Sequence, residues 1–407
     1  MGKTRSTAVL ALCLAAGLFT AACGSSNSGA AANAPEGAET LVIGDLESLT
    51  GAAASVGVPQ ANAVKLAVDQ INESGGIDVD GTTYVIKLDV QDEKSDPTAA
   101  VNAVQKFMSD GTKYMIGTVS SSGLGAYLPI IQDSDDFITV VVGAAQEGVT
   151  QYPSVYRPRV TLSQYTDALS QYVADQGDIK TLATLTDKQH AGFVEALEPL
   201  KSAMADKGIE VVETADYTLG ATEFGAQLSA MLRNKPDALN FRGFPADMTR
   251  AIKQAREQGF DGPIFTTSGI TMTEVDDAQA ATAMDGVTDI YAPLPDDLVE
   301  GDQNAEEAKA FIDAYEDAYG KSPAGTSMSA YDGVYILAQA FEKAGTVDDV
   351  AAVRKALDEL TVDEVPELVE LIKPQDGGRI FDERQAYFQV AVRTWRDGAF
   401  HVDGFVG

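Results

Sequence analysis

Short apolar runs alternate with longer amphipathic segments along most of the chain. The first run, residues 41–44, stops at a glycine, and the segment that Pro59 opens has apolar residues at Val64, Val68 and Ile71. Apolar residues three or four positions apart predict a helix, whereas a short continuous run predicts a buried strand. The pattern therefore begins with a strand, a loop and an amphipathic helix.

The same alternation of strand and helix continues along the chain in two series. It predicts strands over residues 84–90, 113–116 and 137–142 with helices over 97–108 and about 123–133. After Arg157-Pro158-Arg159 it predicts helices over 164–175, 192–207, 221–234 and 246–258 with strands over 181–185, 209–214, 238–241 and 264–266. Strands that alternate with helices at this spacing favour parallel sheets with right-handed crossovers. We therefore expect an α/β protein with two lobes.

The first 22 residues have a different character. Lys3 and Arg5 precede an apolar run over residues 8–22, which is too short for a typical membrane span and is typical of a secretory signal peptide. We therefore predict a signal peptide over residues 1–22 and an exported mature chain.

A tether follows the predicted signal. Residues 18–24 resemble a bacterial lipobox, with Thr20 where leucine is usual, which implies that Cys23 is acylated and becomes the new N-terminus. The alternative is ordinary signal cleavage nearby. Residues 24–39 are rich in small and polar residues, as flexible tethers are. We predict a lipid-anchor tether over residues 23–39, and hence a protein anchored at the extracytoplasmic face of the cell membrane.

Composition excludes several classes. The 407 residues, 45% of them apolar, are enough for two to three packed domains. The net charge is −32, and loss of Lys3 and Arg5 with the signal makes it −34, a field that repels nucleic acid. The only cysteines are Cys13 and Cys23, so the folded part has no disulfide.

Metal and nucleotide sites are also excluded. His190 and His401 have no partner at metal-ligand spacing. Gly320-Lys321-Ser322 ends like a phosphate loop, but Tyr315 stands where the first glycine is needed and no strand precedes it. We expect no metal and no cofactor.

Three consecutive serines, Ser120, Ser121 and Ser122, follow the predicted strand over residues 113–116. They could form a linker, a nucleophile, a phosphate cradle or a hydrogen-bonding lip for a ligand. A nucleophile needs a strained turn and a base, and no evident histidine partner is present. In open α/β sheets, ligands bind beyond the carboxyl ends of strands, where helix starts offer free N–H groups. The lip is therefore favoured, with Ser122 as a helix cap.

An ordered set of motifs resembles one known family. The set comprises the lipobox and tether, Leu41-Val42-Ile43-Gly44, Thr50-Gly51, Ala67-Val68-Asp69-Gln70-Ile71-Asn72 with Gly75-Gly76, Asp96-Pro97, Tyr114 to Gly117 with the serines, and Ala330-Tyr331-Asp332-Gly333. Together these residues resemble the branched-chain amino acid (Leu/Ile/Val) type of periplasmic-binding protein, over about residue 39 to the C-terminus.

The resemblance implies a fold and a role. The fold is the type I periplasmic-binding protein: two Rossmann-like lobes with parallel sheets, joined by three hinge crossovers, which close on a ligand. We assign residues 40–160 and 293–383 to the first lobe, and 161–292 and 384–407 to the second. The implied role is binding, not catalysis: a monomeric substrate-binding component that presents a small-molecule solute to the permease subunits of an ABC importer.

The resemblance also implies ligand contacts. The family's carboxylate-binding positions fall on Ser121 and residues 144–146, where Gln146 replaces a usual threonine or serine. The family's acidic ammonium partner falls on Ser268, and Val56 and Ala191 stand where tyrosines are frequent. Ser120 matches a position that often holds a cysteine. Phe244 and Tyr331 are predicted to form aromatic walls of the site. The residues predicted to bind ligand are Ser120, Ser121, Ser122, Ala144, Gln146, Arg242, Phe244, Ser268 and Tyr331.

These departures leave the solute open. Arg242 follows a predicted strand and either binds a ligand carboxylate or pairs with one of the many acidic side chains. Without an acidic residue at Ser268, an ammonium would lose its charged partner. The solute is thus a branched-chain amino acid or an organic or aromatic acid. A ligand-sensing subunit of a membrane receptor is the alternative function.

Overall fold

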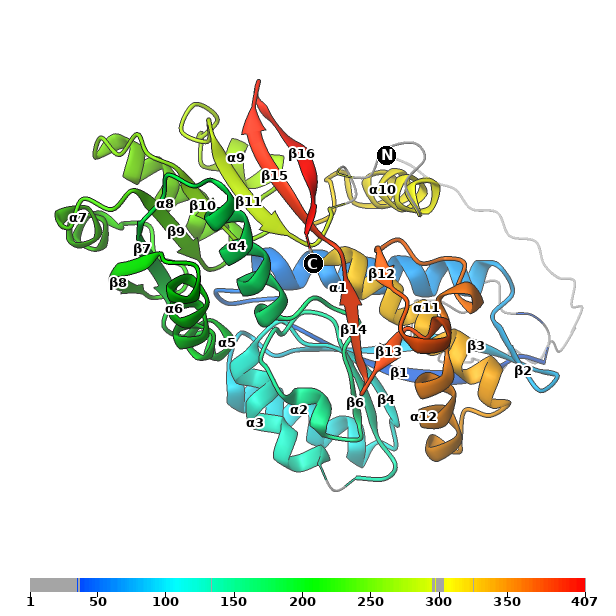
Figure 1. The fold of residues 1–407 in the computed structure, drawn as a ribbon. Helices are drawn as coiled ribbons and strands as arrows, with labels where there is room; N and C mark the ends of the chain where they lie inside the picture. Colours follow the sequence, from blue (N-terminus) through cyan, green and yellow to red (C-terminus); the bar gives the residue numbers. More distant parts are fainter. Residues whose placement is uncertain are drawn as a thin grey trace, which may run out of the picture.

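The computed structural model describes residues 35, 37–132, 134–294, 297, 304–324 and 326–406. The predicted signal peptide, Cys23 and most of the tether lie outside the described residues. The described chain forms two α/β lobes that lie side by side (Figure 1). This confirms the fold class expected from the sequence.

Lobe 1 is built on a six-stranded sheet in the order β2-β3-β1-β4-β5-β6. Only the short hairpin strand β2 runs antiparallel to its neighbour. The strands are β1 (Glu39–Glu47), β2 (Ile77–Val79), β3 (Thr82–Asp92), β4 (Tyr114–Gly117), β5 (Ile138–Val141) and β6 (Val155–Tyr156). One face of the sheet is covered by α1 (Ala54–Glu73), α10 (Ala305–Tyr319), α11 (Ser327–Ala344) and α12 (Val350–Glu359). The other face is covered by α2 (Pro97–Ser109) and α3 (Ser121–Ile131).

Lobe 2 is built on a seven-stranded sheet in the order β16-β15-β11-β10-β9-β7-β8. Its strands are β7 (Thr181–Asp187), β8 (Glu210–Tyr217), β9 (Ala238–Arg242), β10 (Ile264–Thr266), β11 (Val287–Tyr291), β15 (Val390–Arg396) and β16 (Ala399–Val406). Its helices are α4 (Leu162–Asp175), α5 (Ala191–Glu195), α6 (Leu197–Asp206), α7 (Gly225–Arg233), α8 (Pro245–Glu257) and α9 (Met272–Asp277). The two C-terminal strands are antiparallel additions to an otherwise parallel sheet.

The chain passes between the two sheets three times, after β6, after β11 and after β14 (Gln385–Phe388). β14 pairs with β12 (Ile372–Lys373) and β13 (Phe381–Asp382), so residues 385–388, assigned to the second lobe from the sequence, do not pair with its sheet. The first and third crossings are joined, because Arg157 Nε donates to Gln385 Oε1 at 2.6 Å. Short 3-10 turns lie at Val149–Gln151, Val362–Glu364 and Asp376–Gly378.

Three helix starts differ from the sequence prediction. α1 begins at Ala54, so Pro59 lies inside the helix rather than at its start. Ser120, not Ser122, caps α3, because the Ser120 hydroxyl accepts a hydrogen bond from the N–H of Gly123 at 3.1 Å. The helix predicted over residues 192–207 is two helices that meet at Ala196.

Candidate functional site

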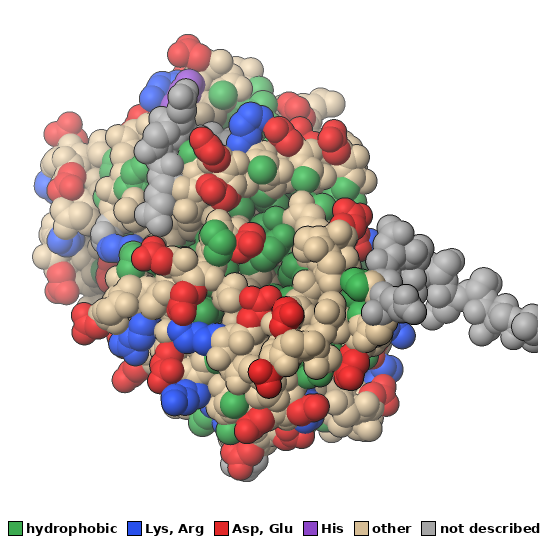
Figure 2. Space-filling model, turned by 90° about the vertical axis from the view of Figure 1, so that its right-hand side faces the viewer, with side chains coloured by type: hydrophobic (Ala, Val, Ile, Leu, Met, Phe, Trp, Pro, Cys, Tyr) green, Lys and Arg blue, Asp and Glu red, His purple; other side chains and the backbone are tan. Residues whose placement is uncertain are grey.

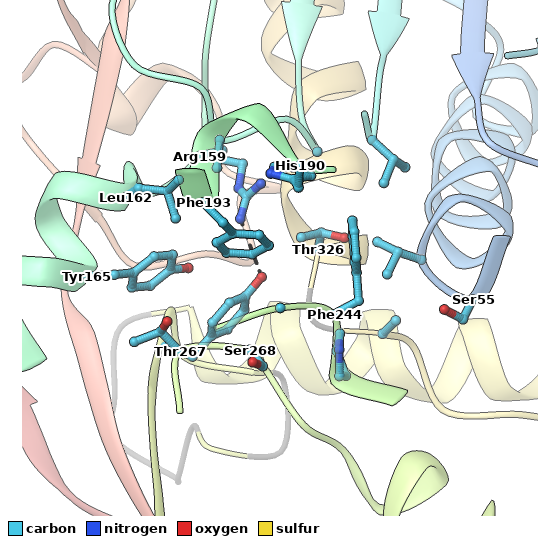
Figure 3. A pocket seen from close by; sticks show the side chains of 18 of the residues that line it. Ser55, Arg159, Leu162, Tyr165, His190, Phe193, Phe244, Thr267, Ser268 and Thr326 are labelled. Atoms are coloured by element: carbon cyan, nitrogen blue, oxygen red, sulfur yellow. Dashed lines mark hydrogen bonds between the residues drawn. The ribbon is translucent and has the colours of Figure 1, made fainter. Parts of the chain in front are cut away.

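A cavity lies between the lobes, where the carboxyl ends of both sheets face each other (Figure 3). Lobe 1 and its returning segment contribute Ser55, Val56, Val119, Gly143, Ala145, Ala324 and Thr326. The first crossing and lobe 2 contribute Arg159, Leu162, Tyr165, His190, Phe193, Gly243, Phe244, Pro245, Thr267, Ser268, Glu274 and Tyr291. The cavity holds about 50 Å³, whereas small-molecule sites usually hold roughly 300–1,000 Å³. A solute must therefore widen it.

One wall of the cavity is aromatic. The His190 ring lies 4.6 Å from the Phe193 ring and 5.4 Å from the Phe244 ring, measured between centroids. Burial, with the nearby Arg159 charge, lowers the pKa of His190 to about 3, so the imidazole is neutral at physiological pH. The wall thus presents apolar ring surface rather than a second cation.

Arg159 brings a positive charge to the cavity. It stands on the first crossing between the lobes, is 7% exposed, and its Nη2 lies 3.5 Å from the Tyr291 hydroxyl. Tyr291 in turn stacks on Tyr165, with ring centroids 5.0 Å apart. Figure 3 shows the Arg159 side chain reaching in from the crossing toward the rings.

None of the three predicted serines lines the cavity, and two of them contact lobe 2. Ser121 is fully buried, and its Oγ lies 3.2 Å from Nε2 of His190 in lobe 2. Ser122 Oγ donates to the carbonyl of Gln189 at 3.0 Å. The expectation that these serines lack a histidine partner is wrong, because His190 meets Ser121 across the lobes.

The stretch after β5 reaches the cavity through alternate residues. Gly143 and Ala145 line the cavity, while Ala144 packs into the core of lobe 1 beneath α3. The backbone carbonyl of Gln146 accepts a hydrogen bond from Arg157. The side-chain oxygen Oε1 of Gln146 has no hydrogen-bond partner among the described residues. Gln146 thus binds the first crossing through its backbone.

Phe244 and Ser268 are the two predicted ligand residues that line the cavity. Tyr331 does not line it. The Tyr331 hydroxyl lies within hydrogen-bond distance of Gln70 Oε1, at 2.5 Å, and its ring packs 4.8 Å from that of Phe311 in the lobe 1 core.

Arg242 ends β9 just before the lining residue Gly243, is 3% exposed and does not itself line the cavity. Burial lowers the pKa of its guanidinium to about 10. Its Nη1 has no hydrogen-bond partner among the described residues. The role of Arg242 as a ligand contact stays a prediction.

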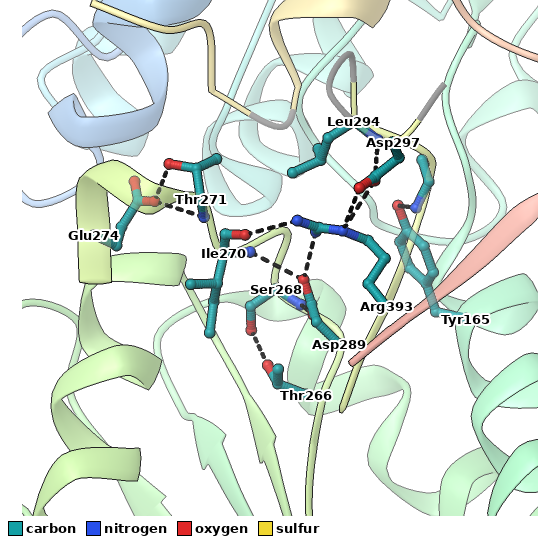
Figure 4. A network of polar contacts seen from close by, with 11 residues as sticks. Tyr165, Thr266, Ser268, Ile270, Thr271, Glu274, Asp289, Leu294, Asp297 and Arg393 are labelled. Carbon is teal, nitrogen blue, oxygen red and sulfur yellow. Dashed lines mark hydrogen bonds and ion pairs between the residues drawn. The ribbon is translucent and has the colours of Figure 1, made fainter. Parts of the chain in front are cut away.

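A buried ion cluster holds the loop that carries Ser268 (Figure 4). Asp289 accepts hydrogen bonds from the N–H groups of Ser268 and Ile270, both at 3.0 Å. Arg393 binds Asp289 at 3.0 Å and Asp297 at 2.9 Å, and donates to the Ile270 carbonyl at 3.0 Å. The antiparallel strand β15 thereby fixes one wall of the cavity.

Sequence reasoning missed Arg159 and Glu274 as cavity residues. Arg159 belongs to Arg157-Pro158-Arg159, which precedes the second series of helices and strands. Its signal was an arginine at the junction of two α/β series in a strongly acidic chain. Glu274 lies in the first turn of α9, six residues beyond Ser268, and only the fold shows that it faces the cavity.

Two further features bear on the class of site. Within the described part of the chain, no group of three or more His, Cys, Asp and Glu side chains is arranged to hold a metal ion. None of the helices described there is both long and apolar enough to cross a membrane.

Known proteins share this architecture. The model of the family described as "Periplasmic binding protein" matches residues 40–398, and the chain therefore belongs to that family. This confirms the resemblance to periplasmic-binding proteins seen in the sequence.

Individual relatives are more distant. A leucine-, isoleucine-, valine-, threonine- and alanine-binding protein of Pseudomonas aeruginosa is 28% identical over 76% of this chain and 80% of its own length. The leucine-binding protein LivK of Thermotoga maritima has a TM-score of 0.77 at 21% identity, covering 90% of this chain and 99% of LivK. An ABC-transporter solute-binding protein of R. palustris in complex with benzoate has a TM-score of 0.72 at 21% identity, covering 90% and 96%. The structural likenesses show the shared fold.

Proposed function

We propose that the chain is the extracytoplasmic solute-binding component of an ABC importer. One observation carries the proposal: a cavity enclosed by both lobes, at the carboxyl ends of their strands, with three chain crossings behind it. A cavity of about 50 Å³ opens only if the lobes separate, and hinge motion about such crossings is a common closing mechanism. Membership of the periplasmic binding protein family supports the same role.

The contacts across the cleft suit a closed form. Ser121 with His190 and Ser122 with Gln189 join the lobes directly. Each such hydrogen bond contributes about 0.5–1.5 kcal/mol net, which is too little to hold the lobes together alone. A solute that touches both lobes would supply the rest and shift the population toward the closed form, which the permease would recognise.

The experiment is a mass spectrum of the solute released from freshly purified protein by mild denaturation. Small-angle scattering of the solute-free and reloaded protein accompanies it. We expect one small polar organic solute in near-stoichiometric amount and a smaller radius of gyration after reloading. Absence of any bound or rebinding solute, or turnover of the solute during incubation, contradicts the proposal.

We further propose that Cys23 carries the lipid anchor. Two sequence features support the proposal: residues 18–24 resemble a lipobox, and residues 24–39 are rich in small and polar residues, as flexible tethers are. Metabolic labelling with an alkyne fatty acid should mark the wild-type chain and not Cys23→Ser. Equal labelling of both chains, or of neither, contradicts the anchor.

A further inference from the structure

Three polar side chains converge on the cavity with little or no protein partner. Arg159, His190 and Thr326 are each 7% exposed and all line it. The hydroxyl of Thr326 has no hydrogen-bond partner among the described residues. The His190 ring meets Ser121 through Nε2 and the Val119 backbone contributes to its pKa, while its Nδ1 has no hydrogen bond of good geometry there. Buried polar groups are normally hydrogen-bonded, because leaving such a bond unmade is unfavourable. Their orientation indicates a partner that enters the cavity.

Arg159 is the cationic member of this set. Within the described residues, its guanidinium makes no ion pair within 4.0 Å, and its hydrogen bond to Tyr291 is long, at 3.5 Å. Arg157, two residues away, is fully engaged by Gln385, Gln146 and Glu147. A buried arginine without a carboxylate is costly unless a ligand supplies one, and guanidinium geometry matches a carboxylate.

Two acids lie near Arg159, and neither offers a free carboxylate to an ammonium group in the cavity. Glu370 is 2% exposed and does not line the cavity, and burial raises its pKa well above its usual range although the Arg159 charge lowers it. Glu274 lines the cavity, but its carboxylate caps α9 by accepting from the N–H and hydroxyl of Thr271, at 2.9 and 2.6 Å. Glu274 also borders an outer groove beside Asp277, and it makes no ion pair with Arg159 among the described contacts. An α-amino acid carries its ammonium one carbon from its carboxylate, so the ammonium would lie near Arg159 without a charged partner.

The rest of the lining is suited to an apolar body. Phe193 and Phe244 meet edge to face, with centroids 6.3 Å apart, and the neutral His190 ring completes the wall. Val56, Leu162 and Ala145 face the same cavity. Aromatic and branched aliphatic groups both pack favourably against such a surface.

We infer that Arg159 binds the carboxylate of the transported solute, and that this solute is a monocarboxylic acid with an aromatic or branched aliphatic body and no α-ammonium group. Thr326 and Tyr291 donate further hydrogen bonds to the carboxylate. This inference rests on the proposed function of the cleft and adds the class of solute to it.

The first experiment compares matched ligands by calorimetric titration of the full mature chain. The pair 4-methylpentanoate and leucine differs only by the α-ammonium group, and the pair benzoate and benzamide differs by the charge. We expect each acid to bind at least about 30-fold more tightly than its partner, because leucine would bury an ammonium without a charged partner and benzamide would leave the buried Arg159 without one. Tighter binding of leucine, or equal binding of benzamide, overturns the inference.

The second experiment tests the residue. Arg159→Met should weaken acid binding by at least about 30-fold, and Arg159→Lys should restore part of it, because lysine keeps the charge without the planar fork. Arg396→Met is the matched control, since this exposed arginine pairs with Asp403 far from the cavity. If Arg159→Met folds and binds acids like the control, the inference fails. If it does not fold, the matched ligands decide.

The solute released from the purified protein separates this inference from the proposed function. A bound carboxylic acid without an α-amino group supports both. A bound amino acid or uncharged solute overturns the inference and leaves the binding function intact. No bound or rebinding solute of any class overturns the binding function itself.

Discussion

Two carboxylates are buried without partners at the end of the first strand. Asp45 and Glu47 lie two residues apart on β1 and are 1% and 0% exposed. None of their four oxygens has a hydrogen-bond partner among the described residues. Burial raises the pKa of Asp45 to about 8 and raises that of Glu47 well above its usual range, with the Asp45 and Glu93 charges adding to the Glu47 shift. Folding therefore favours their protonated forms.

The sign of the pH effect follows from these shifts. Between about pH 4, the usual pKa of aspartic acid, and about pH 8 the folded state binds more protons than the unfolded state, so the unfolding free energy falls as pH rises. Asp45→Asn removes one titrating group. We expect it to raise the unfolding free energy at pH 8 by about 1–3 kcal/mol and to flatten its dependence between pH 5.5 and 8, measured by urea unfolding. The exposed Asp135→Asn is the control, and an equal response of both variants would contradict the assignment.

Gly243 has no room for a side chain beside Tyr217. A Cβ at Gly243 would lie 2.0 Å from the Tyr217 hydroxyl and 3.0 Å from Cε of Met248. We expect Gly243→Ala to lower the unfolding free energy by about 1–3 kcal/mol, and Tyr217→Phe in the same chain to recover most of the loss, because it removes the clashing oxygen. Gly225→Ala should cost nothing, because its Cβ would lie 3.8 Å from Nε2 of Gln258, an ordinary van der Waals distance. Purely additive losses at Gly243 and Tyr217 would disprove the clash.

At the scale of elements, β15 supports the site from behind. Its buried Arg393 joins Asp289 and Asp297, whereas the exposed Arg396 on the same strand pairs with Asp403 at 2.7 Å. Arg393→Met leaves buried carboxylates without their cation, and we expect a loss of about 3–5 kcal/mol in urea unfolding. Arg396→Met should cost about 1 kcal/mol or less. Similar losses in both variants would show that burial of the cluster is not what matters.

Elements with a strong helical or strand period could be predicted from the sequence, and those without it could not. The alternation through residue 266 predicted the two series of parallel strands, because buried parallel strands are short apolar runs between amphipathic helices. β15 and β16 were not predicted. β16 is an edge strand of exposed and half-buried residues, and β15, although mostly buried, has Arg393 and Thr394 within its apolar run and follows no crossover helix. The start of α3 was misplaced within a run of three serines, any of which can cap a helix.

At the scale of the whole molecule, the site forms where segments distant in sequence meet. Phe244 and Ser268 could be predicted through the family resemblance, and each stands two residues beyond a strand, which is where ligands bind in open sheets. Arg159 stands on a crossing, which has no periodic pattern, and its role depends on Tyr291, 132 residues further on. The Ser121–His190 contact likewise needs both lobes to be placed. Composition and period contain no information on such contacts.

The molecule's charge sets a condition on how an anionic solute arrives. The chain carries a net charge of −32, and acidic side chains are spread over the whole face drawn in Figure 2. This field repels an anion at long range, while Arg159 attracts it only inside the cavity. Salt shortens the Debye length from about 30 Å at 0.01 M to about 8 Å at 0.15 M, so it screens the surface field and leaves the buried contact nearly unchanged.

We therefore expect the association rate constant of a carboxylate solute to rise several-fold from 0.01 to 0.15 M salt, since electrostatic steering acts mainly on association. The dissociation rate constant should change little, because the ion pair with Arg159 is shielded from the solvent. Stopped-flow fluorescence of the closing cleft measures both rates, with sucrose at matched osmolality as the control for non-ionic effects. A rate of association that falls with salt would mean that a local positive field reaches beyond the cavity and guides the anion in.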